Sequence, residues 1–401
     1  MLFQSSLYFL RLAIAVLIYW SIGNRVRARF FAIVVGSLGV ALYLFRKNLQ
    51  TNIALIFCAA MAISLLLSFR LGLAIMKKRR QILMLAGLAL PFFIFLIPPL
   101  GTSLGLVSSP TVSWVVPVSL GFFALRQSHF IFECYRGGIK NADFVSYVAY
   151  ILFFPSLIAG PLERYPKFIN QVTNARLSWD HFGVATERLI SGAFKKFVIA
   201  DGLIAAALPP AELSQTAFAD VSWWSLVFAC AAKFLYVYFD FAGYTDMARG
   251  TARLFGIELI SNFNFPLLRS NLAEFWRSWH ISLSSFLRDY VYFPLVAKYR
   301  NTVVPMLVTM LASAAWHGIN PGWLLWGAHH GIGLVCLARF QRYAVKFPWL
   351  AQFRTTNLWR AVATLATWYY VILGFAFTWC VDDISLSLKI YLKFLTFGLV
   401  A

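Results

Sequence analysis

The first third of this sequence lacks acidic residues altogether. The chain has 401 residues, and its first Asp or Glu is Glu133. Twelve basic residues precede that position: Arg11, Arg25, Arg27, Arg29, Arg46, Lys47, Arg70, Lys77, Lys78, Arg79, Arg80 and Arg126. A segment without carboxylates can supply neither carboxylate acid/base catalysis nor a carboxylate metal site. We therefore expect any such chemistry in the later part of the chain, which holds all 15 acidic residues.

Charge of either sign is scarce throughout. Charged residues make up 12% and hydrophobic residues 60% of the chain, and the mean hydropathy is +0.72. Soluble domains are about 45–50% apolar and disordered chains need low hydrophobicity, so both classes are excluded. The net charge of +20 favours basic loops that face anionic cytoplasmic lipid. Nucleic-acid binders carry such charge on a soluble scaffold. The composition predicts a multi-pass protein of the lipid bilayer with no nucleic-acid partner.

Several functional motifs are missing. The five cysteines form no C-x-x-C pair and lie in or beside apolar runs, so we expect buried, inert thiols without a zinc site or disulfides: Cys58, Cys134, Cys230, Cys336 and Cys380. No P-loop, H-E-x-x-H or H-x-x-x-D occurs. Residues 101–105 match the hydrolase pattern G-x-S-x-G. Because they follow Pro98 and Pro99 and not a strand, we interpret this match as chance. We predict no metal site.

The chain does contain many long apolar runs. A membrane-spanning helix needs about 20 mostly apolar residues. Candidate runs lie near residues 6–22, 30–45, 51–76, 81–99, 111–132, 142–159, 187–208, 221–245, 303–317, 322–340, 358–381 and 385–401. Several are short or interrupted, so we predict an all-α fold with about ten transmembrane helices plus re-entrant or interfacial helices. No clear cleavage site follows the first run, which we expect to be retained as a helix.

The basic loops predict an orientation. Two apolar runs separate the clusters at residues 25–29 and 77–80, so both clusters lie on one side, which the positive-inside rule makes cytoplasmic. The N-terminus then lies outside, and residues 135–140 return to the cytoplasm. The Arg46–Lys47 pair falls outside, as an exception to the rule.

Two irregular tracts interrupt the apolar pattern. Residues 160–166 contain a glycine and two prolines and cannot continue a helix, and residues 163–200 mix charges with aromatics. Residues 249–300 hold ten charged residues. Such tracts lie at the interface or line a protein cavity. Without repeats or linkers, we predict a single membrane domain over residues 1–401. Its predicted parts are scaffold helices at 1–132, a catalytic core at 133–340 and C-terminal helices at 341–401.

The densest polar group lies within residues 274–290. As one helix, this segment would carry a cationic, hydrogen-bonding stripe along a single face. The stripe consists of Arg277, His280, Ser284 and Arg288. It could face a cavity and bind a substrate. The alternative is an interfacial helix with a solvated basic face.

A second candidate is His317, within Trp316-His317-Gly318. It ends an uncharged run where glycines and a proline at 318–322 break the helix. Ionisable residues in membrane segments are costly and therefore functional candidates. A neutral imidazole can act as general base, and a broken helix leaves N–H groups that could stabilise an oxyanion. The alternative is a core histidine bonded to a carbonyl. His329 and His330 are adjacent, so at most one of them should face the same cavity.

The third group contains two acids, Asp240 and Asp246, among aromatics. They could act in acid/base catalysis. We favour ion pairs instead, because a buried acid is tolerated mainly when paired. The partners considered are Arg249, Arg277 and Arg288.

These tracts occur in an order that is similar to a known family. They are Tyr135-Arg136-Gly137, the segment 153–161, the Asp240 tract, Asn262-Phe263-Asn264-Phe265-Pro266, the segment 275–284 and Trp316-His317-Gly318. Over residues 120–340 the chain resembles the membrane-bound O-acyltransferase (MBOAT) family, in particular its bacterial branch of alginate O-acetylation and D-alanyl-lipoteichoic-acid transfer proteins. Residues 195–201 and 245–248 resemble the acetylation side, whereas the length is closer to the D-alanylation side.

The resemblance implies a funnel-shaped helical bundle in the bacterial cytoplasmic membrane, with a cavity or tunnel reaching His317 from both faces. His317 matches the family's catalytic histidine and His280 its second histidine motif. The implied roles are general base for His317 and donor binding or orientation for His280 with Arg277 or Ser284. Trp316, Asp240 and Asn264 complete the expected substrate-binding set.

The resemblance also implies the reactants. The donor would be a cytoplasmic thioester, acetyl-CoA or an acyl-carrier protein, with no bound cofactor. The acceptor would be a hydroxyl outside, on an envelope polysaccharide or a relay protein. We expect transfer of an acetyl-like group. D-alanyl transfer is the alternative within the class, and a non-catalytic transporter or flippase is the alternative from another class.

Overall fold

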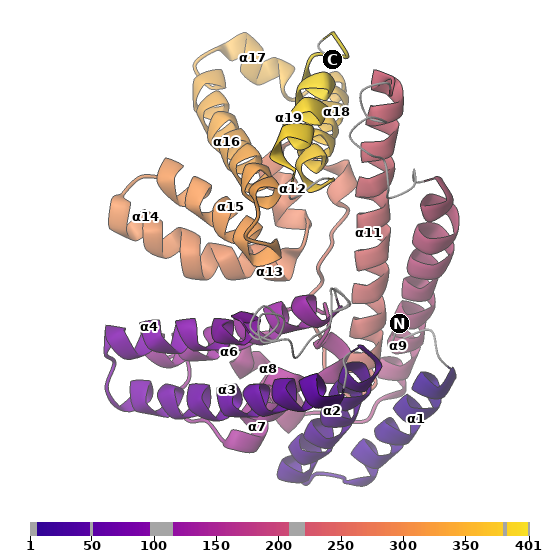
Figure 1. The fold of residues 1–401 in the computed structure, drawn as a ribbon, viewed down its shortest axis with the longest axis vertical. Coiled ribbons are helices and arrows are strands. Elements are labelled where there is room, and N and C mark those ends of the chain that lie inside the picture. The colour runs from indigo at the N-terminus through magenta and orange to yellow at the C-terminus, as the bar shows by residue number, and fades with distance from the viewer. Residues whose placement is uncertain (1–5, 49–50, 97–114, 208–220, 380–382, 400–401) are drawn as a thin grey trace. The chain divides into compact units, whose positions relative to one another are not determined.

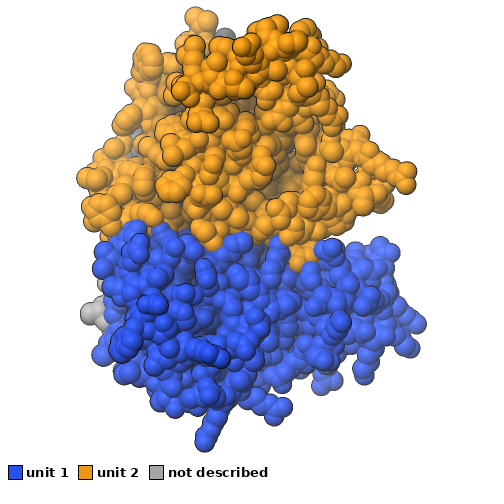
Figure 2. All heavy atoms as spheres, turned by 180° about the vertical axis from the view of Figure 1, so that it is seen from behind, with its two compact units in different colours: residues 1–192, 244–260 blue, residues 193–243, 261–401 orange. Residues whose placement is uncertain are grey.

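The structure, a computed structural model, describes residues 6–48, 51–96, 115–207, 221–379 and 383–399. Every regular element in these ranges is a helix, and one isolated bridge joins Phe263 to Trp279. The predicted all-α class is therefore confirmed. Chain contacts divide the protein into two compact units, residues 1–192 with 244–260 and residues 193–243 with 261–401 (Figure 2). These unit boundaries differ from the predicted boundaries after residues 132 and 340. The single membrane domain over residues 1–401 stays a prediction.

Unit 1 holds the N-terminal helices (Figure 1). They are α1 (Ser6–Ser21), α2 (Val26–Asn48), α3 (Thr51–Lys77), α4 (Gln81–Ala89), η2 (Leu90–Leu96), α6 (Val115–Arg136), α7 (Phe144–Leu152), η3 (Phe154–Ser156), α8 (Tyr165–Thr173) and α9 (Trp179–Ala193). The helix α11 (Trp223–Arg253) contributes its residues from Tyr244 onward to this unit and the earlier ones to unit 2.

Unit 2 contains the remaining helices. They are η4 (Phe194–Ile204), η5 (Ala205–Ala207), most of α11, η6 (Pro266–Leu268), α12 (Leu272–Ser278), α13 (Ile281–Leu287), η7 (Arg288–Tyr292), α14 (Phe293–Tyr299), α15 (Val303–His317), α16 (Pro321–Ala344), α17 (Pro348–Phe353), α18 (Asn357–Gly374), η8 (Phe375–Thr378) and α19 (Ile384–Leu395). One core cluster of unit 2 packs α11 against α12, α18 and α19 around Phe234, Phe275 and Phe394. Short polar caps start several of these helices, for example the Asn320 side chain, which accepts from the Trp323 amide at 3.2 Å.

Each predicted apolar run coincides with helix in the described residues, and the lengths of these helices differ. Within the part of the chain that the structure describes, four helical segments are long and apolar enough to cross a membrane: Val26–Tyr43, Cys58–Lys77, Trp223–Arg253 and Asn357–Thr378. Four shorter apolar helices are Tyr8–Ser21, Gln81–Phe93, Phe144–Ser156 and Val303–His317. Helices of 10–17 residues cover only about 15–26 Å, less than the bilayer core of about 30 Å. The number of about ten transmembrane helices stays a prediction.

A buried arginine holds the backbone where the predicted break near residue 160 begins. Arg126 is 2% exposed. It donates to the Ile151 carbonyl at 2.8 Å, to the Ser156 hydroxyl at 2.6 Å and to the Ser156 carbonyl. Carbonyls at a helix end lack intrahelical partners, and a guanidinium offers several donors. The cation therefore satisfies the end of α7 within unit 1.

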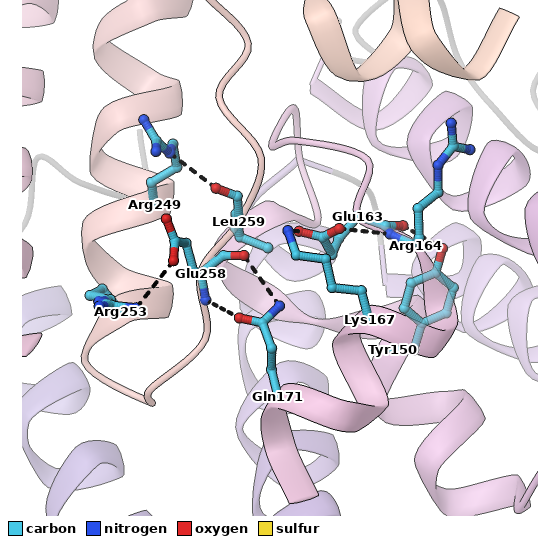
Figure 3. A network of polar contacts seen from close by, with 9 residues as sticks. All are labelled: Tyr150, Glu163, Arg164, Lys167, Gln171, Arg249, Arg253, Glu258 and Leu259. Carbon is cyan, nitrogen blue, oxygen red and sulfur yellow. Dashed lines mark hydrogen bonds and ion pairs between the residues drawn. The ribbon is translucent and has the colours of Figure 1, made fainter. Parts of the chain in front are cut away.

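Beyond this break, Glu163 organises the start of α8 (Figure 3). Its carboxylate accepts from the Arg164 amide at 3.0 Å and from Lys167 at 3.1 Å, and its carbonyl accepts from the Tyr150 hydroxyl at 2.8 Å. The predicted irregular tract is thus an ordered turn with its polar groups paired.

The end of α11 is tied to α8 in the same network (Figure 3). Gln171 receives the Glu258 amide at 2.6 Å and donates back to its carbonyl at 3.2 Å. Arg253 lies 3.5 Å from the Glu258 carboxylate, and Arg249 donates to the Leu259 carbonyl at 3.2 Å. These bonds explain why residues 244–260 belong to unit 1.

Two loops that were predicted to share one side lie together in unit 1. A side-chain carbon placed at Gly137 would lie 2.3 Å from the guanidinium of Arg79. Gly137 also has a left-handed backbone, with φ of +82°, which glycine adopts without steric cost. The contact agrees with the predicted topology for residues 77–80 and 135–140.

The thiols follow the sequence prediction in part. Cys134 and Cys230 are buried and Cys58 is half-buried, but Cys336 on α16 is exposed. The prediction of burial is therefore wrong for Cys336, because its apolar helix turns that position outward. Cys380 and the G-x-S-x-G segment at 101–105 lie outside the described residues.

Candidate active site

His317 occupies the closed end of the helical hairpin formed by α15 and α16, which Figure 1 shows as neighbours in unit 2. It is the last residue of α15, and α16 begins four residues later at Pro321. The predicted break is confirmed. The Gly318 amide donates to the Ala314 carbonyl at 3.0 Å and the Trp323 amide to Asn320. These two donors are therefore committed within the turn and cannot serve an oxyanion.

Three indoles surround the His317 ring. Trp323 stacks on it with ring centroids 4.5 Å apart and an interplanar angle of 14°. Trp316 and Trp326 meet it edge-on at 4.7 and 5.8 Å. His317 itself is exposed. Its imidazole is thus oriented by its neighbours while reactants can still reach it.

His280 lies beside this group and is buried. Its ring meets Phe241 of α11 at 4.7 Å and Trp316 at 5.8 Å. Trp316 therefore contacts both His280 and His317. The two histidines predicted to be catalytic are 37 residues apart in sequence and both contact one indole.

The prediction of one helix over residues 274–290 is wrong. The helix α12 ends at Ser278, and His280 has a left-handed backbone with φ of +45° before α13 begins. The cause is pairing with a distant segment. Ile281 donates to the Asn262 carbonyl at 3.0 Å, Ser282 to the Asn262 side chain at 3.2 Å, and Asn264 to the Ser278 carbonyl at 3.0 Å.

This break separates the predicted stripe. Arg277 is exposed and donates to the Ala273 carbonyl at 3.2 Å, whereas His280 is buried. Ser284 donates to the Trp279 carbonyl at 3.0 Å. Arg288 is exposed and pairs with Asp289 at 2.9 Å. The four side chains therefore do not form a single cationic face.

Asp240 forms an ion pair, as favoured, but with a different partner. Lys196 of η4, 3% exposed, contacts both Asp240 and Asp201, the latter at 3.0 Å. The two carboxylates compensate the charge of this buried ammonium group. Asp246 does pair with the predicted Arg249, at 3.8 Å, and with Arg188 at 3.1 Å.

Three residues near the site were not predicted from the sequence. Asn262 is fully buried and braces the His280 loop, whereas the predicted Asn264 is exposed. The alternation of Asn and Phe over 262–265 was the available signal, because it is typical of extended backbone. Trp323, three residues after the capping Asn320, lies on the first turn of α16 and so returns to His317. Lys196 gave no local signal, since its partner Asp240 is distant in sequence.

The adjacent histidines differ in surroundings, as predicted. His329 stacks on Tyr370 at 4.0 Å, and its ring nitrogens lie 3.0 Å from the Tyr370 carbonyl and 3.3 Å from the Tyr391 hydroxyl. His330 is fully buried and meets Trp326 at 4.8 Å. Trp326 also contacts His317, so His330 is the one that belongs to the indole group. Within the described ranges, no three His, Cys, Asp or Glu residues are grouped as metal ligands.

Three proteins illustrate what this chain is similar to. It is 35% identical over 241 residues to the probable alginate O-acetylase AlgI of Pseudomonas syringae pv. tomato, covering 58% of this chain and 45% of that protein. It is 30% identical over 295 residues to the peptidoglycan O-acetyltransferase of Helicobacter pylori (62% and 54%). It is 26% identical over 274 residues to the teichoic acid D-alanyltransferase of Bacillus subtilis (64% and 67%). The chain spans about half the length of the alginate O-acetylases it matches.

A family model also matches more than half of the sequence. The model for MBOAT, the membrane-bound O-acyltransferase family, matches residues 118–378. This segment is well over half of the chain and contains both His280 and His317. The chain therefore belongs to the membrane-bound O-acyltransferase family.

Proposed function

We propose that this protein is an O-acyltransferase that moves an acetyl-like group from a cytoplasmic thioester to a hydroxyl on the cell envelope. The observation that carries the proposal is the His317 imidazole, which is exposed yet oriented by Trp323 stacking. The family match and the similarity to two O-acetyltransferases support it.

The proposed mechanism needs one base and one acyl donor. His317 accepts the proton of the acceptor hydroxyl, whose oxygen attacks the thioester carbonyl carbon. The tetrahedral intermediate expels the thiolate, which takes the proton back from the imidazolium. The C–S bond breaks, the C–O ester bond forms, and the base is regenerated. His280, beside Trp316, would orient the donor together with Ser284 or Arg277. The further substrate-binding residues would be Trp316, Asp240 and Asn264.

The reactants follow from the class of chemistry. A thioester, as acetyl-CoA or an acyl-carrier protein, would arrive from the cytoplasm, and the acceptor would be an envelope polysaccharide or a relay protein outside. About ten membrane crossings around a funnel or tunnel in the bacterial cytoplasmic membrane would give both reactants access to His317. D-alanyl transfer is the second candidate, favoured by similarity to a teichoic acid D-alanyltransferase.

Replacement of His317 tests the proposal directly. In purified membranes supplied with labelled acetyl-CoA and envelope acceptor, we expect His317→Ala, His317→Asn and His317→Gln each to lower acyl transfer at least a hundredfold, since general-base catalysis contributes about 10²–10⁴. A carrier protein charged with D-alanine replaces acetyl-CoA in a parallel reaction and identifies the donor.

The matched control is His329→Gln, because His329 lies on the same hairpin but contacts Tyr370 and Tyr391 and not the His317 ring. Full transfer activity of all three His317 variants, inserted at normal levels, would contradict the acyltransferase mechanism and favour a transporter or flippase.

A further inference from the structure

The open end of the α15–α16 hairpin contains a pocket that the proposed chemistry does not use. Its volume is about 420 Å³, and all its lining residues belong to unit 2. The floor is largely apolar, from Val303 and Met306 on α15 and Val335 and Ala338 on α16. The rim is polar and strongly basic. It consists of Arg300, Asn301, Thr302, Arg339 and Arg342.

The three arginines are free of acidic partners. All three are exposed, and within the described residues none is paired with a carboxylate. Arg342 instead donates to the Thr302 hydroxyl at 3.4 Å. The sequence explains this, because no Asp or Glu occurs between Asp289 and Asp382. The positive charge of these three side chains is therefore available to an anionic ligand.

The geometry concentrates this positive charge. Arg339 and Arg342 are spaced i, i+3 on α16, so they lie on one face, and like charges at that spacing repel. Arg300 is added from the preceding turn, where it has a left-handed backbone with φ of +49°. An anion at the rim would relieve this repulsion.

We propose that this pocket binds a phosphate group, held by Arg300, Arg339 and Arg342, with the apolar part of the same ligand over the floor. Guanidinium groups recognise phosphate oxygens with paired hydrogen bonds. A phosphate carries several acceptor oxygens and can serve more than one arginine at once.

Two ligands share this chemistry. One is an anionic lipid, whose headgroup phosphate would meet basic residues at a helix end. The other is the phosphopantetheine arm of the thioester donor. The pocket and His317 lie at opposite ends of α15, whose 15 residues span about 22 Å. A linear arm anchored by its phosphate could thus extend along the hairpin. Only this second source rests on the proposed function.

The test compares ligands that differ by one phosphate. The full chain is placed in phosphatidylcholine nanodiscs, and binding of 4′-phosphopantetheine and of pantetheine is measured by titration calorimetry. We expect at least tenfold tighter binding of the phosphorylated compound. Arg339→Gln/Arg342→Gln should abolish that preference. Arg360→Gln, which removes an exposed arginine of the same acid-free segment outside the pocket, should keep it.

A second experiment tests whether the bound phosphate belongs to a lipid. Native mass spectrometry measures phosphatidylglycerol retained by each variant after purification from mixed lipid. One outcome is that only the double variant loses the retained lipid, while the wild-type protein shows no preference for phosphopantetheine. This outcome assigns the bound phosphate to a lipid headgroup and supports the proposed phosphate site. If neither phosphate distinguishes the double variant from Arg360→Gln, the proposal is wrong.

Folding and function are kept separate in this design. Arg339→Lys/Arg342→Lys keeps the charge and should retain part of the preference, so misfolding of the glutamine variant does not decide the outcome. Neither binding experiment uses an acylated ligand, so neither depends on acyl transfer. Inactive wild-type protein that still binds phosphate would contradict the proposed function and leave the pocket proposal standing.

Discussion

At the scale of single residues, ring contacts determine how His317 is presented. Trp323 lies flat against the imidazole, and Trp316 and Trp326 approach from the edges. Aromatic pairs of this kind contribute about 0.5–1.5 kcal/mol beyond burial. That energy resists rotation of the ring, so the nitrogen that accepts a proton points in one direction before substrate arrives.

Removal of the stacking partner should therefore slow transfer without removing the base. We expect Trp323→Leu to lower the rate constant of acyl transfer about tenfold, because the ring samples other orientations. Trp323→Phe should keep most of the activity, since a flat ring remains. Steady-state kinetics on purified membranes measure both. Equal losses in the two variants would show that bulk, and not stacking, is what the site requires.

One candidate site residue, His317, could be recognised from its residue type and its place in the sequence. An isolated histidine at a glycine- and proline-rich break in an uncharged run is conspicuous, and His317 was found in this way. The identity of the Asp240 partner was not accessible, because Lys196 and Asp240 are 44 residues apart and only the fold joins them. Asn262 was overlooked for a similar reason, since its bonds go to residues 281 and 282.

At the scale of elements, the α15–α16 hairpin depends on close approach of the two helices. A methyl group at Gly327 would lie 2.7 Å from the Ala314 side chain and 2.8 Å from the Met310 carbonyl. The second atom is backbone and cannot move aside alone. Glycine at this position therefore sets the separation of the two helices that carry His317 and the indoles.

A pair of glycine substitutions tests this packing. We expect Gly327→Ala to destabilise the protein by about 1–3 kcal/mol, the usual effect of overpacking. Gly39→Ala is the control. It lies inside α2, where nothing is within 4 Å of the added carbon, so it should be neutral or stabilising by up to about 1 kcal/mol. Thermal unfolding in detergent measures both, and equal melting temperatures would contradict the close-packing argument.

The helix boundaries show where local pattern is sufficient. The long apolar runs became helices because periodicity and polar caps such as Asn320 act over a few residues. Residues 274–290 have the spacing of a helix as well, yet two helices form there. The exchange of backbone hydrogen bonds with residues 262–264 outweighs the local preference, and such a long-range effect leaves no trace in the spacing.

At the scale of the whole molecule, charge predicts which loops share a side of the membrane. The contact between Arg79 and Gly137 already brings two of these loops together in unit 1. The positive-inside rule applies also to the unpaired arginines Arg300, Arg339 and Arg342. It predicts that they lie on the cytoplasmic side as well.

Cysteine labelling measures this topology. In a background without the five native cysteines, single reporters Asn24→Cys, Asn141→Cys and Asn301→Cys should react with a membrane-impermeant maleimide only after spheroplasts are permeabilised. Asn48→Cys should react in intact spheroplasts. Labelling of residues 24 and 141 from opposite sides would overturn the predicted orientation.

The two units are interleaved along the chain, and this affects how the protein is made. Unit 1 is incomplete until residues 244–260 are added, because Trp20 donates to Leu254, Tyr8 bonds Thr251 and Arg188 pairs with Asp246. After residue 192 the ribosome must translate 68 further residues, up to residue 260, which takes about 3–14 s at 5–20 residues per second. Until Asp246 has been translated, Arg188 lacks the carboxylate with which it pairs in the folded unit. Because the segments of the two units alternate along the chain, no single cut can separate one complete unit from the other.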